Sequence, residues 1–268
     1  MLSLSKHLCE PKNIFNNFKK IFADFALKST FYKKKNPEIC NLNFKPKTLN
    51  LESTYEYLQQ FLTPERFQKI EHYSKESSDF VLPVMEDIYQ FRNAAAIVRS
   101  VEACGFHKVI AMEKENFFEP NLKVTKGADT WVEVEKMPRT IESLQNIKNR
   151  GYKIVAVSAE NNAKMLPDYK IEEPLALVFG TEWEGTTEEL LDFADETLAI
   201  PMFGFTRSFN VSVAAAICMY ELKQKLLKSD IDYKLSEEKL LQMKIRWAKN
   251  SIPSGDMILE KYLRENQI

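Results

Sequence analysis

Residues 175–185 read LALVFGTEWEG, and this stretch decides the fold. Its continuous run of five apolar residues is typical of a strand buried on both faces, as in the parallel sheet of an α/β protein. The run ends in Gly180, Glu182 and Gly185, and ligands usually bind where the strands of such a sheet end. The stretch therefore predicts a buried strand with a candidate ligand site at its carboxyl end. An ordinary strand-to-helix turn would explain the same residues.

The segments around this strand alternate between strand and helix patterns. Further strands are expected at residues 108–112, 153–157 and 198–201. Helices are expected at residues 63–77, 93–104, 140–150, 186–193, 210–228, 236–249 and 254–265. Helix starts are signalled by capping boxes at residues 53–56 and 186–189 and by a Thr-Pro pair at 63–64. The alternation predicts an α/β fold with a parallel sheet flanked by helices.

Several common kinds of site are missing from the sequence. It has only seven glycines and contains no GxGxxG, GxxxxGK[ST], GxSxG or HExxH motif. The four cysteines and three histidines lie far apart, so neither a zinc site nor a disulfide framework is indicated. No apolar run approaches the roughly 18 residues of a membrane-spanning helix. We therefore expect a cytoplasmic protein without a metal or a membrane segment.

The net charge of −1 is unevenly distributed. Residues 1–50 hold ten lysines, no arginine and three acidic residues, a local charge of +7 that leaves −8 for the rest. A basic extension is compatible with nucleic-acid contact, and equally with a solvated tail. The missing arginine makes this segment a poor match to a mitochondrial transit peptide.

Two further stretches bear polar groups on helices. In residues 93–105, NAAAIVRSVEACG, the apolar Ile97 and Val101 share one helix face, and Arg99 lies roughly opposite among alanines. Such small neighbours let a ligand approach the guanidinium, although a plain surface arginine fits too. In residues 200–217, IPMFGFTRSFNVSVAAAI, Ser208 or Asn210 is placed to cap a helix whose free N–H groups can hold a ligand. Capping with close helix packing is the simpler interpretation.

Together these stretches resemble the three motifs of the SpoU/TrmH group of SPOUT methyltransferases. The motifs are N-x-x-A-I-x-R at 93–99, G-x-E-x-x-G at 180–185 and I-P-M-x-G-x-x-x-S-x-N-V-S-V-A at 200–214. Residues 62–67 and 124–131 resemble the transfer-RNA branch, which methylates the 2'-hydroxyl of guanosine 18 in the D-loop. One departure is Phe209, where the family commonly has leucine.

The resemblance implies a fold, a cofactor and a set of site residues. The fold is a parallel sheet with a C-terminal trefoil knot at residues 81–228, the methyltransferase domain. A basic extension (1–50) and a helical RNA-binding segment (51–80) precede it, and C-terminal helices (229–268) follow. The cofactor is S-adenosylmethionine, and its implied contacts are Val157, Gly180, Ile200, Met202 and Phe209. The implied catalytic residues are Arg99, Asn93, Glu182, Ser208 and Asn210.

The role of Arg99 stays open at this level. Using it as a neutral base at pH 7 would cost about 8 kcal/mol, because a free arginine has a pKa above about 12. A gentler role is to grip a phosphate and align the ribose hydroxyl. Family members act as homodimers with sites drawn from both subunits, and we expect the same here.

The RNA partner is expected to be transfer RNA. Basic residues predicted to hold its backbone are Arg66, Lys69, Lys126, Lys223, Lys225 and Lys228. A ribosomal-RNA (23S) methyltransferase of the same family and a non-catalytic RNA-binding paralogue are the alternatives. The intact Arg99 argues against the paralogue.

Overall fold

The computed structural model describes residues 50–119, 125, 127–159, 162–181 and 185–266. Within these residues seven strands form one sheet in the order β3-β2-β1-β6-β4-β7-β5, and every pairing is parallel. The strands are β1 (Val81–Glu86), β2 (Lys108–Glu113), β3 (Glu133–Pro138), β4 (Lys153–Val157), β5 (Lys164–Met165), β6 (Leu175–Phe179) and β7 (Glu196–Ala199). The predicted parallel α/β fold is thereby confirmed.

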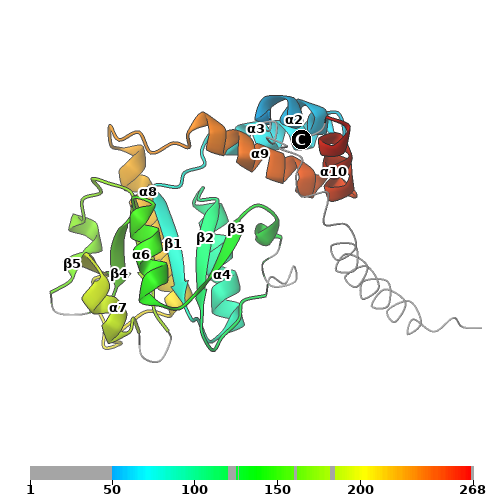
Figure 1. The fold of residues 1–268 in the computed structure, drawn as a ribbon. Helices are drawn as coiled ribbons and strands as arrows, with labels where there is room; N and C mark the ends of the chain where they lie inside the picture. The colour runs from blue at the N-terminus through cyan, green and yellow to red at the C-terminus, as the bar shows by residue number, and fades with distance from the viewer. Residues whose placement is uncertain (1–49, 120–124, 126, 160–161, 182–184, 267–268) are drawn as a thin grey trace, which may run out of the picture. The chain divides into compact units, whose positions relative to one another are not determined.

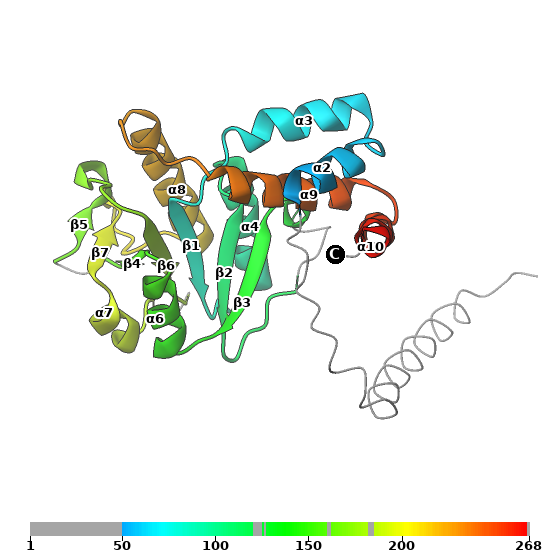
Figure 2. The ribbon, with the colours of Figure 1, turned by 45° about the horizontal axis from the view of Figure 1, so that its top comes forward.

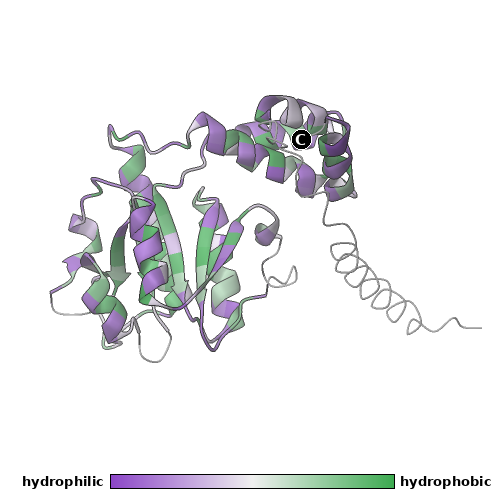
Figure 3. Ribbon diagram, viewed as in Figure 1, coloured by the Kyte–Doolittle hydropathy of each residue, from purple (hydrophilic) through white to green (hydrophobic). Residues whose placement is uncertain are grey.

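Helices cover both faces of this sheet (Figure 1). On one face α4 (Phe91–Ala103) and α8 (Val211–Leu227) pack against side chains such as Met85 and Leu177. On the other face α6 (Ile141–Asn149) and α7 (Glu188–Phe193) pack against side chains such as Val84 and Val178. The alternation of β1 and β6 side chains between the two layers explains why their apolar runs are continuous. Figure 3 shows most of β1 in green, the hydrophobic colour.

Four more helices form a separate apolar cluster. They are α2 (Leu51–Gln59), α3 (Pro64–Ser74), α9 (Glu237–Ser251) and α10 (Gly255–Glu265), grouped together in Figure 2. Their buried side chains include Leu58, Ile70, Met243 and Trp247. The chain segments before and after the sheet domain thus share one core. Two short 3-10 turns, η2 (Ala128–Thr130) and η3 (Leu166–Asp168), complete the described secondary structure.

The observed N-terminal helix caps match only some of the caps predicted from the sequence. Thr63 caps α3 as predicted, since its side chain accepts a hydrogen bond from the Arg66 N–H. The capping box at 53–56 is wrong, because α2 begins earlier and Asn50 accepts from the Ser53 N–H. The box at 186–189 is also wrong: Thr187 is the N-cap of α7, without a side-chain cap bond. The hydroxyl of Thr186 instead donates to the Val157 carbonyl.

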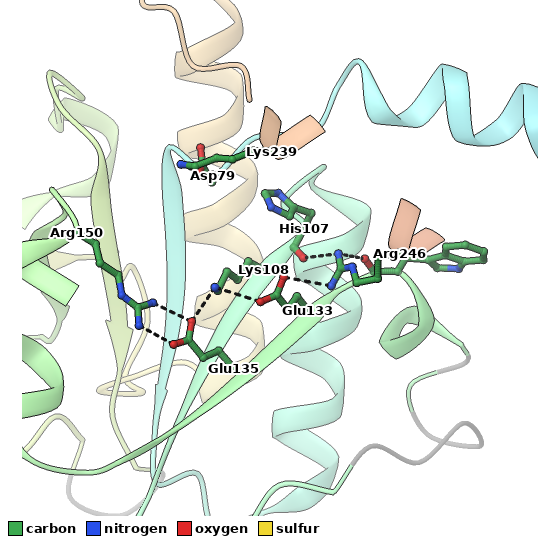
Figure 4. A network of polar contacts seen from close by, with 9 residues as sticks. Asp79, His107, Lys108, Glu133, Glu135, Arg150, Lys239 and Arg246 are labelled. Atoms are coloured by element: carbon green, nitrogen blue, oxygen red, sulfur yellow. Dashed lines mark hydrogen bonds and ion pairs between the residues drawn. The ribbon is translucent and has the colours of Figure 1, made fainter. Parts of the chain in front are cut away.

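Polar contacts join α9 to the edge of the sheet (Figure 4). The guanidinium of Arg246 donates to the carbonyls of Trp131 at 2.9 Å and His107 at 3.3 Å, and the Trp247 indole also donates to Trp131. Arg246 lies 3.6 Å from a carboxylate oxygen of Glu133 on β3. These contacts fix the helical cluster against β2 and β3.

Candidate active site

A cavity of about 710 Å³ opens at the carboxyl ends of β4 and β6. Its walls come from the loops after β4, β6 and β7 and from the starts of α4 and α8, where a parallel sheet usually binds ligands. Eight of the residues predicted from the sequence line it together: Asn93, Val157, Gly180, Ile200, Met202, Ser208, Phe209 and Asn210. The structure thus gathers residues from all three sequence motifs around one space.

Gly180 sits where no side chain fits. A Cβ at this position would lie 2.1 Å from the Thr186 nitrogen and 2.2 Å from the Gly185 carbonyl carbon and oxygen. The close approach arises because Thr181 and Gly185 exchange two backbone hydrogen bonds, at 2.9 and 3.0 Å, which close the loop between them. Gly185 has φ of +71°, a left-handed conformation that glycine adopts at little cost. The loop therefore depends on both glycines.

A side-chain network joins the first and third motifs. The Asn210 amide donates to Oδ1 of Asn93 at 3.1 Å, although 117 residues separate them. Asn210 also caps α8, since its Oδ1 accepts from the Ser212 N–H at 2.9 Å and from the Ser212 hydroxyl at 2.7 Å. Of the two caps that the sequence allowed, the structure therefore has Asn210. Because Asn93 is buried on α4, this network fixes the start of α8 against α4.

The cavity combines apolar walls with a few polar groups. Val157, Leu191, Ile200, Met202 and Ala214 give it apolar surface. Its polar groups include Thr186, Ser208 and the two asparagines, and Arg207 is the basic residue among the described lining. A site for a phosphate-rich ligand would present several N–H groups of a glycine-rich loop or several basic side chains. This lining suits a ligand of mixed polarity without phosphates.

Arg99 lies outside this cavity. It is exposed on α4, six residues beyond Asn93, and is not among the residues that line the space. Glu182 and Lys126 lie outside the described residues. Within one copy of the chain, the cavity therefore gathers Asn93, Ser208 and Asn210 of the predicted catalytic residues but not Arg99.

The predicted RNA-binding residues fall into two groups. Lys69 and Lys228 are exposed and Arg66 is half-buried. Lys223 is buried and donates to the Glu76 carbonyl at 2.8 Å, and burial lowers the pKa of its ammonium. Lys225 donates to the Pro167 carbonyl at 2.5 Å. Both ammonium groups already have intramolecular partners, so their side chains are poorly placed to hold an RNA backbone.

Sequence reasoning missed three residues of this region. Thr186 and Arg207 line the cavity, and Glu86 is a fully buried carboxylate at the carboxyl end of β1. The signal for Glu86 was available, because a charged residue directly follows the apolar run 81–85. Among the residues that the structure describes, no group of three or more His, Cys, Asp or Glu side chains could hold a metal ion. Nor is any helix in that part of the chain long and apolar enough to cross a membrane.

Comparison with known sequences identifies the family. The sequence model of the SpoU rRNA methylase family matches residues 81–220, more than half of the chain. The chain belongs to this family. A relative from Borreliella burgdorferi, a tRNA (guanosine(18)-2'-O)-methyltransferase, is 35% identical over 75% of this chain and 92% of its own length. The Escherichia coli K12 protein of the same name is 31% identical over 61% of this chain and 72% of its own length.

Solved structures of SpoU proteins share the fold. The A. aeolicus TrmH/SpoU tRNA modifying enzyme aligns with a TM-score of 0.64 and 27% identity, over 70% of this chain and 98% of its own. The SpoU methyltransferase AviRb from Streptomyces viridochromogenes, in complex with AdoMet, aligns with a TM-score of 0.51 and 22% identity over 57% and 62%. At that identity, the AviRb match supports the fold alone.

Proposed function

We propose that this SpoU-family chain transfers a methyl group from S-adenosylmethionine to a ribose 2'-hydroxyl of RNA, with guanosine 18 in the D-loop of tRNA as the target. The observation that carries the proposal is the single cavity that gathers residues of all three family motifs. The names of the Borreliella and E. coli relatives, which cover most of the chain, support tRNA as the substrate.

The cavity fits this cofactor. Its volume of about 710 Å³ lies within the range of small-molecule sites, and its lining suits a ligand without phosphates. Val157, Gly180, Ile200, Met202 and Phe209 would hold the cofactor, with the glycine bringing backbone close to it. When bound, the cofactor supplies an electrophilic methyl group on a sulfonium.

The chain's own polar groups then orient the ribose. Asn93 and Asn210 are hydrogen-bonded to each other at the cavity, and Asn210 is also held by its role as the α8 cap. Because both side chains are already positioned, they lose little conformational freedom when RNA binds. Arg99 is assigned the task of aligning the target hydroxyl through the neighbouring phosphate, a bidentate contact that keeps its guanidinium charged. The role of Glu182 in shaping the pocket remains part of the proposal.

A homodimer completes the proposed site. The loop after β7 and the face of α8 expose large apolar side chains: Phe203 is 96% exposed and Val213 44%, and Phe205 and Tyr220 are exposed as well. Exposed apolar surface of this kind marks an interface. A second copy on this face would let Arg99 of one subunit serve the cavity of the other, which accounts for its absence from its own cavity. The family's trefoil knot at residues 81–228, the four-part domain division and a cytoplasmic location, where tRNA is found, belong to the same proposal.

The test is methyl transfer to defined RNA. Purified protein with labelled S-adenosylmethionine should methylate unmodified tRNA at guanosine 18, and a tRNA with a 2'-deoxy sugar there should accept no methyl group. Normal transfer to the deoxy substrate would reject the target. The family's description as rRNA methylases keeps one alternative in view: 23S rRNA, assayed in parallel, would then be the substrate.

A further inference from the structure

A second cavity, of about 500 Å³, lies at the far end of α4 from the candidate active site. Helix α4 lines both: Asn93 near its start borders the active-site cavity, and Glu102 and Ala103 at its end border the second one. Ten residues separate Asn93 from Ala103, so the two sites are roughly 15 Å apart along the helix axis. Arg99 lies between them on the same helix.

The second cavity is lined by aromatic and basic side chains. The Arg66 guanidinium lies over the Trp131 ring, with Cζ 5.0 Å from the ring centroid, and both line the cavity. Tyr73 on α3 also lines it, and its side chain is 59% exposed. Lys69 stands one turn from Tyr73 on α3, exposed at the rim. Proteins stack unpaired bases on exposed aromatic rings and on arginine guanidinium planes. Lysine ammonium groups nearby contact the phosphate of the same nucleotide.

Part of the cavity lining is held in place by contacts within the protein. The buried ammonium of Lys223 donates to the Glu76 carbonyl and lies 4.9 Å from the centroid of the Tyr233 ring. Gly105, with φ of +73°, brings backbone close, since a Cβ there would lie 3.1 Å from the Glu76 carbonyl oxygen. The Lys223 ammonium is therefore already hydrogen-bonded inside the protein. The groups left for a ligand are the aromatic rings and the basic side chains of Arg66 and Lys69.

We propose that this cavity binds an unpaired nucleobase of the same RNA that is methylated. The base stacks on Tyr73, and Lys69 contacts the adjoining phosphate. The inference rests on the proposed function, because it takes RNA as the substrate. Helix α4 then sets the spacing: the second base binds roughly 15 Å from the ribose that is methylated. The enzyme thereby selects RNA that presents two accessible nucleotides at this separation.

The test separates stacking from general charge. Tyr73→Ala should raise the Kd and KM for tRNA about 5- to 100-fold, the effect of losing one stacked base, whereas Tyr73→Phe should stay near wild type. Lys69→Ala should weaken binding and reduce its salt dependence. Lys75→Ala, an exposed lysine on the same segment that does not line the cavity, is the matched control. Tyr73→Ala binding tRNA within twofold of wild type would overturn the proposal.

A binding measurement without methyl transfer keeps the two proposals apart. Fluorescence anisotropy with a labelled six-adenine RNA reports on stacking without reference to guanosine 18. Weaker binding by Tyr73→Ala, restored in Tyr73→Phe, supports the cavity even if no RNA is methylated. Equal binding by the wild type and Tyr73→Ala rejects it even if tRNA is methylated normally. Thermal melting of each variant confirms folding, which these exposed positions should not disturb.

Discussion

Glu86 accepts a hydrogen bond of 2.6 Å from the Thr187 hydroxyl, across 101 residues of sequence. The carboxylate is fully buried at the carboxyl end of β1, and the Arg139 guanidinium lies 2.9 Å from it. Thr187 begins α7 and directly follows Thr186, which lines the active-site cavity. This buried ion pair therefore anchors one wall of the cavity to the centre of the sheet.

Glu86→Ala should lower the free energy of unfolding by about 3–5 kcal/mol, because it leaves the Arg139 charge without its buried partner. Glu86→Gln keeps an acceptor and should fold, yet bind S-adenosylmethionine several-fold more weakly, since the Thr187 loop loses a charged anchor. Calorimetry and thermal melting measure the two effects. Glu189→Gln, at an exposed position on α7, is the control with the same change of charge. Equal cofactor affinity in both variants would show that Glu86 serves stability alone.

Gly180→Ala should abolish measurable cofactor binding. The added Cβ would overlap the Thr186 nitrogen at 2.1 Å, and because the obstacle is backbone, the loop itself must move. Gly204→Ala is the matched control, since a Cβ there meets nothing within 4 Å and its φ is not positive. Calorimetric titration of both variants with S-adenosylmethionine decides the matter. Wild-type affinity in Gly180→Ala would mean that the loop is not part of the site.

The bond between Asn93 and Asn210 predicts coupled effects. Each single alanine variant should weaken cofactor binding, with Asn210→Ala also losing the α8 cap, worth about 1 kcal/mol of stability. In the double variant the losses should fall short of additivity by roughly 0.5–3 kcal/mol, as expected for residues in direct contact. A double-mutant cycle on cofactor affinity measures this coupling. Strict additivity would show that the two amides act separately.

Much of the fold follows from the sequence for identifiable reasons. β4 and β6 are buried on both faces, so their apolar runs were unambiguous and their bounds were predicted correctly. β3 (Glu133–Pro138) was missed, because an edge strand needs little apolar surface and this one bears charged residues that pair with Lys108 and Arg150. The capping boxes failed because their hydroxyls have other partners, as Thr186 has in the Val157 carbonyl. Such tertiary competition is invisible in a local pattern.

The site was predictable only through its motifs taken jointly. Taken alone, the motif around Gly180 is also explained by an ordinary turn, and the motif around Asn210 by a helix cap. The fold places both residues at one cavity. The lysines predicted for RNA contact show the limit of composition. Nothing in the sequence distinguishes Lys69, which is exposed, from Lys223, whose ammonium is buried against the Glu76 carbonyl.

Arg99 should prove essential for turnover and dispensable for cofactor binding. Arg99→Ala is expected to lose at least about 100-fold in kcat, the scale of a lost positioning contact, with unchanged affinity for S-adenosylmethionine. If Arg99 serves the partner's cavity, mixing Arg99→Ala with Gly180→Ala subunits should restore part of the activity, because one site of the mixed dimer then has both groups intact. Each variant alone is the control. Failure to recover activity after subunit exchange would place Arg99 in its own subunit's site.

His107 should make the fold sensitive to mild acid. It is buried at the junction in Figure 4, among the charged groups of Asp79, Glu133 and Arg246, and its Nδ1 is buried without a hydrogen-bond partner among the described residues. Burial first, and then the Arg246 charge, lowers its pKa from 6.5 to about 4. Well above pH 6.5 the imidazole is neutral in both states. As the pH falls from 6.5 toward 4, the unfolded chain takes up a proton that the folded one refuses, so stability is lost.

The loss between pH 7 and pH 5 should be about 2 kcal/mol. Glu135, whose pKa is lowered to about 2 by the Arg150 hydrogen bond, contributes its own loss at lower pH, below about 4.5. The window from pH 7 to 5 therefore isolates the histidine. Urea denaturation across it should give a markedly flatter pH dependence for His107→Gln, while His72→Gln, at an exposed position, should keep the wild-type slope. A His107→Gln slope equal to that of the wild type would contradict the assignment.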